Sequence, residues 1–212
     1  MVDYGELKEA VIFGKAAKVK DLTQQALNEG KGAQEILDQA LIPAMDVVGQ
    51  KFSCAEFYIP EMLIAARAMQ GGVALLKPHL AAAGARAKGK VVLGTVKGDL
   101  HDIGKNLVGM MLEGSGFQVV DLGADVKPER FVEAAQKESP DFVMMSALLT
   151  TTMLAMGETI QALKTAGLRN KVKVAIGGAA VTQRFADEIG ADFYSPTATG
   201  GVAKAKELMG IA

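Results

Sequence analysis

Apolar residues recur every three or four positions through the first part of the chain, which is the spacing of amphipathic helices. The predicted helices span residues 4–15, 19–29, 34–52 and 59–80. Pro43 interrupts the third of these, and a loop at 53–58 precedes the fourth. Four helices with short connections predict a small up-and-down bundle.

The helical pattern ends in a stretch of small and basic residues. Residues 81–90, AAAGARAKGK, have no periodic apolar face and are typical of a linker. We therefore expect two domains, a helical one over residues 1–88 that includes the linker, and a second over 89–212.

The second part alternates short β-branched runs with helical patterns. Predicted strands span residues 91–96, 117–122, 141–148, 172–176 and 192–194, and predicted helices span 103–113, 128–137, 153–165, 181–189 and 202–209. Five such units predict a parallel sheet covered by helices on both faces. Right-handed crossovers make it an open, doubly wound, flavodoxin-like α/β domain with five strands.

Ligands of such sheets bind beyond the carboxyl ends of the strands. Segments 98–104, 146–152 and 177–179 each follow a predicted strand. Because parallel strands end at the same edge, we expect these three segments to meet there.

The first of these segments contains the pattern D-x-H-x-x-G, formed by Asp99, His101 and Gly104. We interpret His101 as the ligand of a metal held in an organic macrocycle. Asp99 can accept the other ring N–H and hold one tautomer, and Thr152 can extend this hydrogen-bond chain. The alternative is an ordinary strand-to-helix turn with a solvated histidine.

Two further segments offer contacts to a ligand. Ser146, Thr150, Thr151 and Thr152 supply hydroxyls after the third strand, and a helix cap accounts for one of them. The 177–178 glycine pair lets the backbone approach a ligand closely, although a plain loop explains it equally well.

Other residues near the motif have simpler expected roles. Asp102 is expected to cap the helix that follows, and Lys105 to be solvated. In the helical part, Phe52 and Ile59 flank the loop between two helices. An apolar bundle end at that place could cover a flat ligand.

Composition excludes several classes of function. The 212 residues are 50% hydrophobic and carry a net charge of −1, without the basic excess that nucleic acid requires. The single cysteine allows no internal disulfide and fits the cytoplasm. The N-terminus has no signal-peptide core and apolar runs are short, so no membrane partner is expected.

The stretch GTVKGDLHDIGKNLVGMMLEGSGFQVVDLG resembles the cobalamin-binding signature of corrinoid methyl carriers. These include the cobalamin domain of methionine synthase and the corrinoid proteins of methanol, methylamine and aryl-ether systems. The S-x-L of residues 146–148 and the 177–178 glycine pair match the other two parts of the signature. The helical part, with PEMLIAARAM at 60–69, resembles the cap domain of the same family.

The resemblance implies a cobalamin or related corrinoid, with His101 as the lower ligand of cobalt and Asp99 and Thr152 tuning it. Thr152 stands where the family usually has Ser, so it keeps the hydroxyl. The benzimidazole tail would enter a pocket beside the sheet, and Phe52 and Ile59 would cover the upper face. The full expected set of corrinoid-binding residues is Phe52, Ile59, Gly98, Asp99, His101, Asp102, Ile103, Gly104, Ser146, Leu148, Thr150, Thr152, Gly177 and Gly178.

The implied function is methyl transfer without a complete active site of its own. Cob(I)alamin would take a methyl group from the substrate of a substrate-specific methyltransferase. Methylcobalamin would then give it to an acceptor methyltransferase serving tetrahydrofolate or a thiol coenzyme. A reductive activation protein is a further implied partner. Methanol, methylamines and aryl methyl ethers, the last making it part of an O-demethylase, stay open as donors.

Three alternatives remain at this point. A cobalamin-dependent regulator or light sensor would share the corrinoid domain, but the balanced charge does not favour DNA binding. The small subunit of an adenosylcobalamin mutase would keep D-x-H-x-x-G without this helical cap. A flavodoxin-like domain with no corrinoid is the third.

Overall fold

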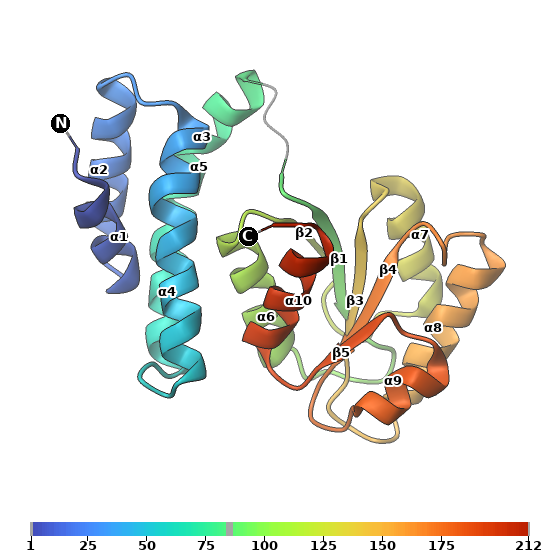
Figure 1. Cartoon of the computed structure of the whole chain (residues 1–212). Helices are drawn as coiled ribbons and strands as arrows, with labels where there is room; N and C mark the ends of the chain where they lie inside the picture. The colour runs from blue at the N-terminus through green and yellow to red at the C-terminus, as the bar shows by residue number, and fades with distance from the viewer. Residues whose placement is uncertain (1, 84–86, 212) are drawn as a thin grey trace. The chain divides into compact units, whose positions relative to one another are not determined.

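The computed structural model describes residues 2–83 and 87–211 of the chain. The chain divides into two compact units, residues 1–87 with 113–116, and residues 88–112 with 117–212. Residues 84–86, in the middle of the predicted linker, lie outside the described residues. Figure 1 labels the elements of both units.

The first unit consists of helices. They are α1 (Tyr4–Ile12), α2 (Ala16–Asn28), α3 (Ala33–Ile36), η1 (Leu37–Leu41), α4 (Ile42–Ser53) and α5 (Ile59–Ala82). Helix α5 packs against α1, α2 and α4. Gly72 allows the close approach, because a Cβ there would lie 3.1 Å from Val19 and 3.2 Å from Leu41. The predicted helical unit is confirmed.

Pro43 does not break the third helical segment. A π-helical turn, η1, precedes α4, and the N–H of Ile42 bonds to the carbonyl of Leu37 five residues back. Pro43 then lies in the first turn of α4, where a missing N–H is tolerated. The predicted interruption is therefore a local widening of a continuous helical path.

Helix α5 is the one helix in the described residues that is long and apolar enough to span a membrane, over Ile59–Leu80. Length and composition of this kind are also typical of a core helix. Its buried residues include Met62, Ala65, Ala66, Ala68, Met69 and Leu76. We therefore assign α5 to the core of the helical unit.

The second unit is a five-stranded parallel sheet with the order β2-β1-β3-β4-β5. Its strands are β1 (Lys90–Thr95), β2 (Gln118–Asp121), β3 (Phe142–Ser146), β4 (Lys173–Gly177) and β5 (Phe193–Ser195). The helices are α6 (Ile103–Gly114), α7 (Pro128–Glu138), α8 (Leu154–Thr165), α9 (Gln183–Ile189) and α10 (Ala198–Leu208). This is the flavodoxin-like order, so the predicted fold class is confirmed.

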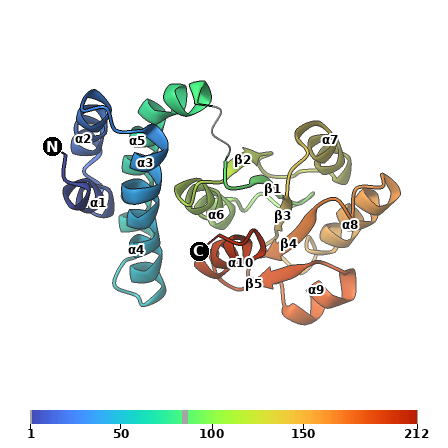
Figure 2. The ribbon, with the colours of Figure 1, turned by 45° about the horizontal axis from the view of Figure 1, so that its top comes forward.

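Helices cover both faces of this sheet. Figure 2 shows α6 and α10 on one face and α7, α8 and α9 on the other. On the first face Phe142 makes edge contacts with Phe117 and Phe193, each with ring centroids 6.3 Å apart. On the opposite face Val143 and Met145 join a core cluster with α7, α8 and α9. Burial on both faces explains why the strands are apolar without alternation.

Candidate functional site

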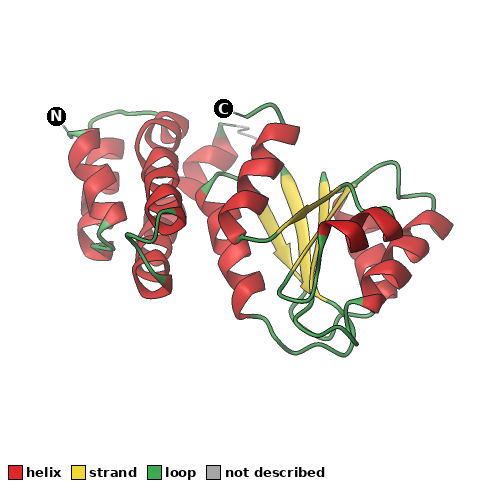
Figure 3. Ribbon diagram, turned by 60° about the horizontal axis from the view of Figure 1, so that its bottom comes forward, coloured by secondary structure: helices red, strands yellow, loops and turns green. Residues whose placement is uncertain are grey.

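The loops after β1, β3 and β4 lie along one edge of the sheet (Figure 3). The strand register places Thr95, Ser146, Gly177 and Ser195 in one row at the carboxyl ends of β1, β3, β4 and β5. The convergence expected from the sequence is therefore present. The three loop segments have side chains and backbone groups within bonding distance of one another.

Asp99 is the centre of this edge, with a fully buried side chain. Its Oδ1 accepts hydrogen bonds from the backbone N–H of His101 at 3.0 Å and from His101 Nδ1 at 2.8 Å. Its Oδ2 accepts from the Leu148 N–H at 2.7 Å and from Thr152 Oγ1 at 2.6 Å. One carboxylate thus joins the β1–α6 loop to the β3–α8 loop.

The hydrogen bonds also determine the charge of Asp99. Burial alone would raise the pKa of its carboxyl group. The bonds from Thr152, from the His101 and Leu148 N–H groups, and from the His101 ring outweigh burial and hold the pKa well below its usual range. Asp99 is therefore anionic and acts as an acceptor, so His101 Nδ1 is the donor of this bond and Nε2 is the ring nitrogen left for a ligand.

His101 has the right surroundings for a metal that brings its own ligands. Its side chain is 53% exposed, while its orienting carboxylate is buried. Within the described residues, no group of three or more His, Cys, Asp or Glu side chains could hold a metal ion. A macrocycle that brings its own metal ligands fits this single exposed imidazole.

Large apolar side chains are exposed in the segment that contains His101 and in the β3–α8 segment, which is joined to it through Asp99. Five large apolar side chains are exposed there, Leu100, Ile103, Leu148, Leu149 and Leu154. Exposed apolar side chains on two joined segments are a feature of ligand-binding surfaces. The surface suits a flat, largely apolar ligand, so the residues fit a corrinoid.

The glycines of the predicted site have different roles. Gly98 has a φ of +81°, and its N–H donates to Asp125 Oδ1 at 2.7 Å. Gly178 has a φ of +121°, and a Cβ there would lie 1.9 Å from the Ala147 carbonyl oxygen. Gly178 is thus required by the packing of two loops, and its predicted approach to a ligand stays a prediction. At Gly104 a Cβ would meet open space.

Two further expectations concern residues around α6. Asp102 precedes the helix, and its carboxylate accepts from the Asn106 side chain at 3.0 Å. The expectation that Lys105 is solvated is wrong, because its side chain is 1% exposed. Lys105 Nζ donates to Asp121 and Asn106, and this pairing of α6 with the end of β2 was not visible in the local sequence.

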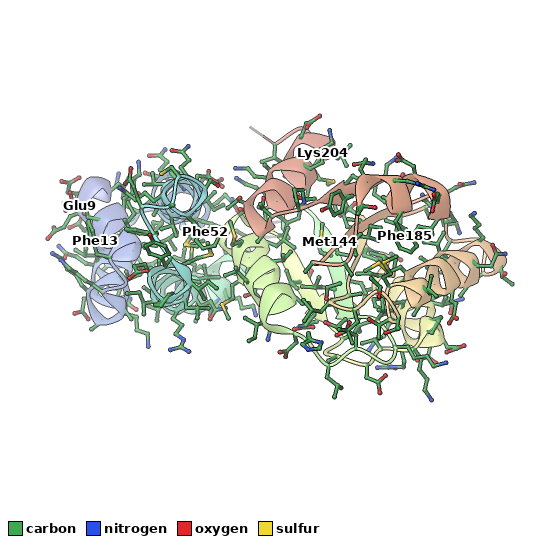
Figure 4. The ribbon with its side chains drawn as sticks, turned by 90° about the horizontal axis from the view of Figure 1, so that it is seen from below. Glu9, Phe13, Phe52, Met144, Phe185 and Lys204 are labelled. Carbon is green, nitrogen blue, oxygen red and sulfur yellow. The ribbon has the colours of Figure 1, made fainter. Side chains whose placement is uncertain are left out.

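The remaining predicted residues are placed as follows. Thr150 is exposed in the loop after β3. In the helical unit, Phe52 is half-buried on α4, where Figure 4 labels it, and Ile59 is 44% exposed at the start of α5. The expected role of these two side chains over a ligand stays a prediction.

Sequence reasoning missed two residues that build the site. Asp125 holds the β1–α6 loop through Gly98, and its own N–H donates to the Asp99 carbonyl at 3.0 Å. Thr95, fully buried, contacts Ser146 and the His101 carbonyl. Thr95 could have been found by aligning the predicted strand ends, whereas nothing local marks Asp125.

Comparison with known proteins agrees with this geometry. A protein-family model described as "B12 binding domain" matches residues 89–203. A second family model with the same description matches residues 4–77. A corrinoid protein of Desulfitobacterium hafniense strain Y51 is 42% identical over 208 residues, which are 97% of this chain and 96% of the relative. The chain belongs to the B12-binding corrinoid proteins. The resemblance to corrinoid methyl carriers is thereby confirmed, and the cofactor is a corrinoid.

Other corrinoid proteins match over nearly the whole chain. The dimethylamine corrinoid protein of Methanosarcina barkeri is 43% identical over 205 residues, 96% of each chain. The structure of the methanol:cobalamin methyltransferase complex MtaBC of M. barkeri contains a chain with a TM-score of 0.89 and 33% identity. The match covers 98% of this chain and 79% of that one. A cobalamin-binding protein of D. hafniense DCB-2 has a TM-score of 0.80 and 33% identity, with 98% of both chains covered.

Proposed function

We propose that this corrinoid protein carries a methyl group between two methyltransferases, with His101 as the protein ligand of cobalt. The observation that supports it best is the buried Asp99, which fixes the proton on His101 Nδ1 and leaves Nε2 exposed as a ligand. A bound corrinoid supplies a cobalt centre that can take up and release a methyl group.

In this proposal the chain's own residues hold the corrinoid and orient the His101 ring. Thr152 and the Leu148 N–H fix the Asp99 carboxylate, which fixes the imidazole ring. Phe52 and Ile59 of the helical unit would be further contacts of the corrinoid. The surface that holds the corrinoid consists of Gly98, Asp102, Ile103, Gly104, Ser146, Leu148, Thr150, Gly177 and Gly178.

The proposed partners are a substrate-specific methyltransferase, an acceptor methyltransferase serving tetrahydrofolate or a thiol coenzyme, and a reductive activation protein, all in the cytoplasm. The names of the relatives support the first of these. The names refer to dimethylamine and to methanol, so an amine or an alcohol is favoured as the methyl donor over an aryl ether.

The two corrinoid-based alternatives have less support. A mutase subunit would not need the helical unit. This chain instead covers 96% of the dimethylamine corrinoid protein, including the helical part. Whole-length similarity therefore favours the carrier.

The test is reconstitution of the apoprotein with hydroxocobalamin and then methylcobalamin, followed by gel filtration and absorption spectroscopy. The wild type is expected to retain one corrinoid with a spectrum of histidine coordination. His101→Ala is expected to lose that spectrum, because it removes the proposed imidazole ligand.

The matched control is His79→Ala, which removes the other histidine of the chain, an exposed residue on α5. It is expected to behave as the wild type. Loss of histidine coordination in His79→Ala but not in His101→Ala would contradict the assignment. Retention without methyl transfer to any methyltransferase pair would contradict the carrier function while leaving the corrinoid in place.

A further inference from the structure

Thr95 is the most deeply placed polar side chain next to the candidate site. It is the last residue of β1 and is fully buried. Its Oγ1 donates to the His101 carbonyl oxygen at 3.2 Å and lies 2.8 Å from Ser146 Oγ. One hydroxyl therefore touches the backbone of the proposed cobalt ligand and the side chain of a proposed corrinoid-binding residue.

The proton count makes this contact directional. A threonine hydroxyl has one proton, and a carbonyl oxygen can only accept. When Thr95 donates to the His101 carbonyl, Ser146 must donate to Thr95. We call this chain, from Ser146 Oγ through Thr95 Oγ1 to the His101 carbonyl, the hydroxyl relay.

A ligand can change the relay at its outer end. Ser146 is half-buried at the edge of the sheet, whereas Thr95 is fully buried and has no exposure to solvent. A ligand group that accepts a hydrogen bond from Ser146 occupies the O–H that Ser146 otherwise donates to Thr95. Thr95 must then either donate to Ser146, which ends its bond to His101, or lose its bond to Ser146.

We propose that Thr95 is a positioning residue that couples occupancy of Ser146 to the backbone position of His101. This inference rests on the proposed function, because it assumes that the ligand at Ser146 and the ligand at His101 are parts of one corrinoid. It adds a second connection to His101, independent of Asp99, which acts on the imidazole ring and the N–H rather than the carbonyl.

The substitutions follow from the geometry. Thr95→Val keeps the branched shape that a buried strand favours and removes the hydroxyl. Thr95→Ser keeps the hydroxyl and serves as the conservative rescue. Thr159→Val is the matched control, because Thr159 is equally buried and donates to Ala155 at 2.8 Å on α8, away from the relay.

The first measurement is equilibrium binding of hydroxocobalamin, with the absorption spectrum as a second readout. Thr95→Val is expected to raise the Kd about five- to tenfold, the equivalent of one hydrogen bond, because the His101 backbone is no longer held by Thr95 and must be ordered when the ligand binds. It is also expected to lower the histidine-coordinated fraction in the spectrum. Thr95→Ser should restore both readouts, and Thr159→Val should change neither.

The second measurement is a double-mutant cycle with Ser146→Ala. In the wild-type background, Ser146→Ala is expected to change the histidine-coordinated fraction. In the Thr95→Val background it should have no further effect on that fraction, because the relay is already broken. Additive effects of the two substitutions would overturn the coupling, as would a wild-type spectrum in Thr95→Val.

A ligand-free readout separates failure of this inference from failure of the proposed function. Backbone amide exchange over residues 99–104 of the apoprotein is expected to be faster in Thr95→Val than in the wild type or Thr159→Val. If the wild type retains no corrinoid, the proposed function fails, and unchanged exchange in Thr95→Val would overturn the relay itself.

Discussion

The helical unit and the sheet unit differ in whether their buried polar side chains have hydrogen-bond partners. Between residues 2 and 83, the buried polar side chain is Thr23, and its hydroxyl has no hydrogen-bond partner. The sheet unit buries Thr95, Asp99 and Lys105 close to one edge, and each of them is paired. Because buried polar groups are costly unless they are satisfied, paired ones concentrated at one edge indicate where position matters.

The largest expected effect is that of Asp99→Ala, which deletes the acceptor for donors from two loops. Losing several hydrogen bonds to one buried, ionised carboxylate should lower the free energy of unfolding by about 3–5 kcal/mol. Denaturant unfolding of the apoprotein measures it, with Asp21→Ala, at an exposed position on α2 of the helical unit, as the control. A loss below about 1 kcal/mol would show that the network is solvated.

The glycines provide a second comparison between the units. Gly178→Ala should cost about 3 kcal/mol, because the new Cβ meets the Ala147 carbonyl and φ is +121°. Gly30→Ala in the helical unit also has a positive φ, +81°, but its Cβ would meet nothing within 4 Å. It should cost about 1 kcal/mol, from backbone strain alone. Thermal unfolding of both variants measures the difference, and equal losses would contradict the close packing.

Removing Asp121 and removing Lys105 from their ion pair should lower the stability by different amounts. Asp121→Ala leaves the ammonium of Lys105 buried, and should lower stability by about 2 kcal/mol. Lys105→Met leaves Asp121, which is 45% exposed, to water and should cost under about 1 kcal/mol. Urea midpoints of the two variants measure this asymmetry, and the reverse order would show that Lys105 is solvated.

The smallest expected effect is a gain in the free energy of unfolding. Thr23→Val in the helical unit removes a buried hydroxyl without a partner and keeps the branched shape, so stability should rise by about 1 kcal/mol. The same chemical change at Thr95 is expected to weaken corrinoid binding. A loss of stability in Thr23→Val, measured by thermal unfolding, would show that its hydroxyl is satisfied by water.

Much of this protein is determined by the sequence itself. The change from a helical period to β/α alternation occurs within short windows, so the two kinds of unit and the fold class were predictable. The pair Asp99 and His101 is two residues apart, and the loop that contains them brings the carboxylate to the ring without help from distant segments.

Other features depend on residues that are distant in the chain and were decided only by the tertiary structure. Thr95 meets Ser146 across 51 residues, Gly98 meets Asp125 across 27, and Lys105 meets Asp121 across 16. These contacts follow from strand register and from the path of the β2–α7 loop, which no local pattern specifies. The chemistry of His101 was therefore readable in the sequence, whereas the residues that hold its loop in place appear only when the sheet has formed.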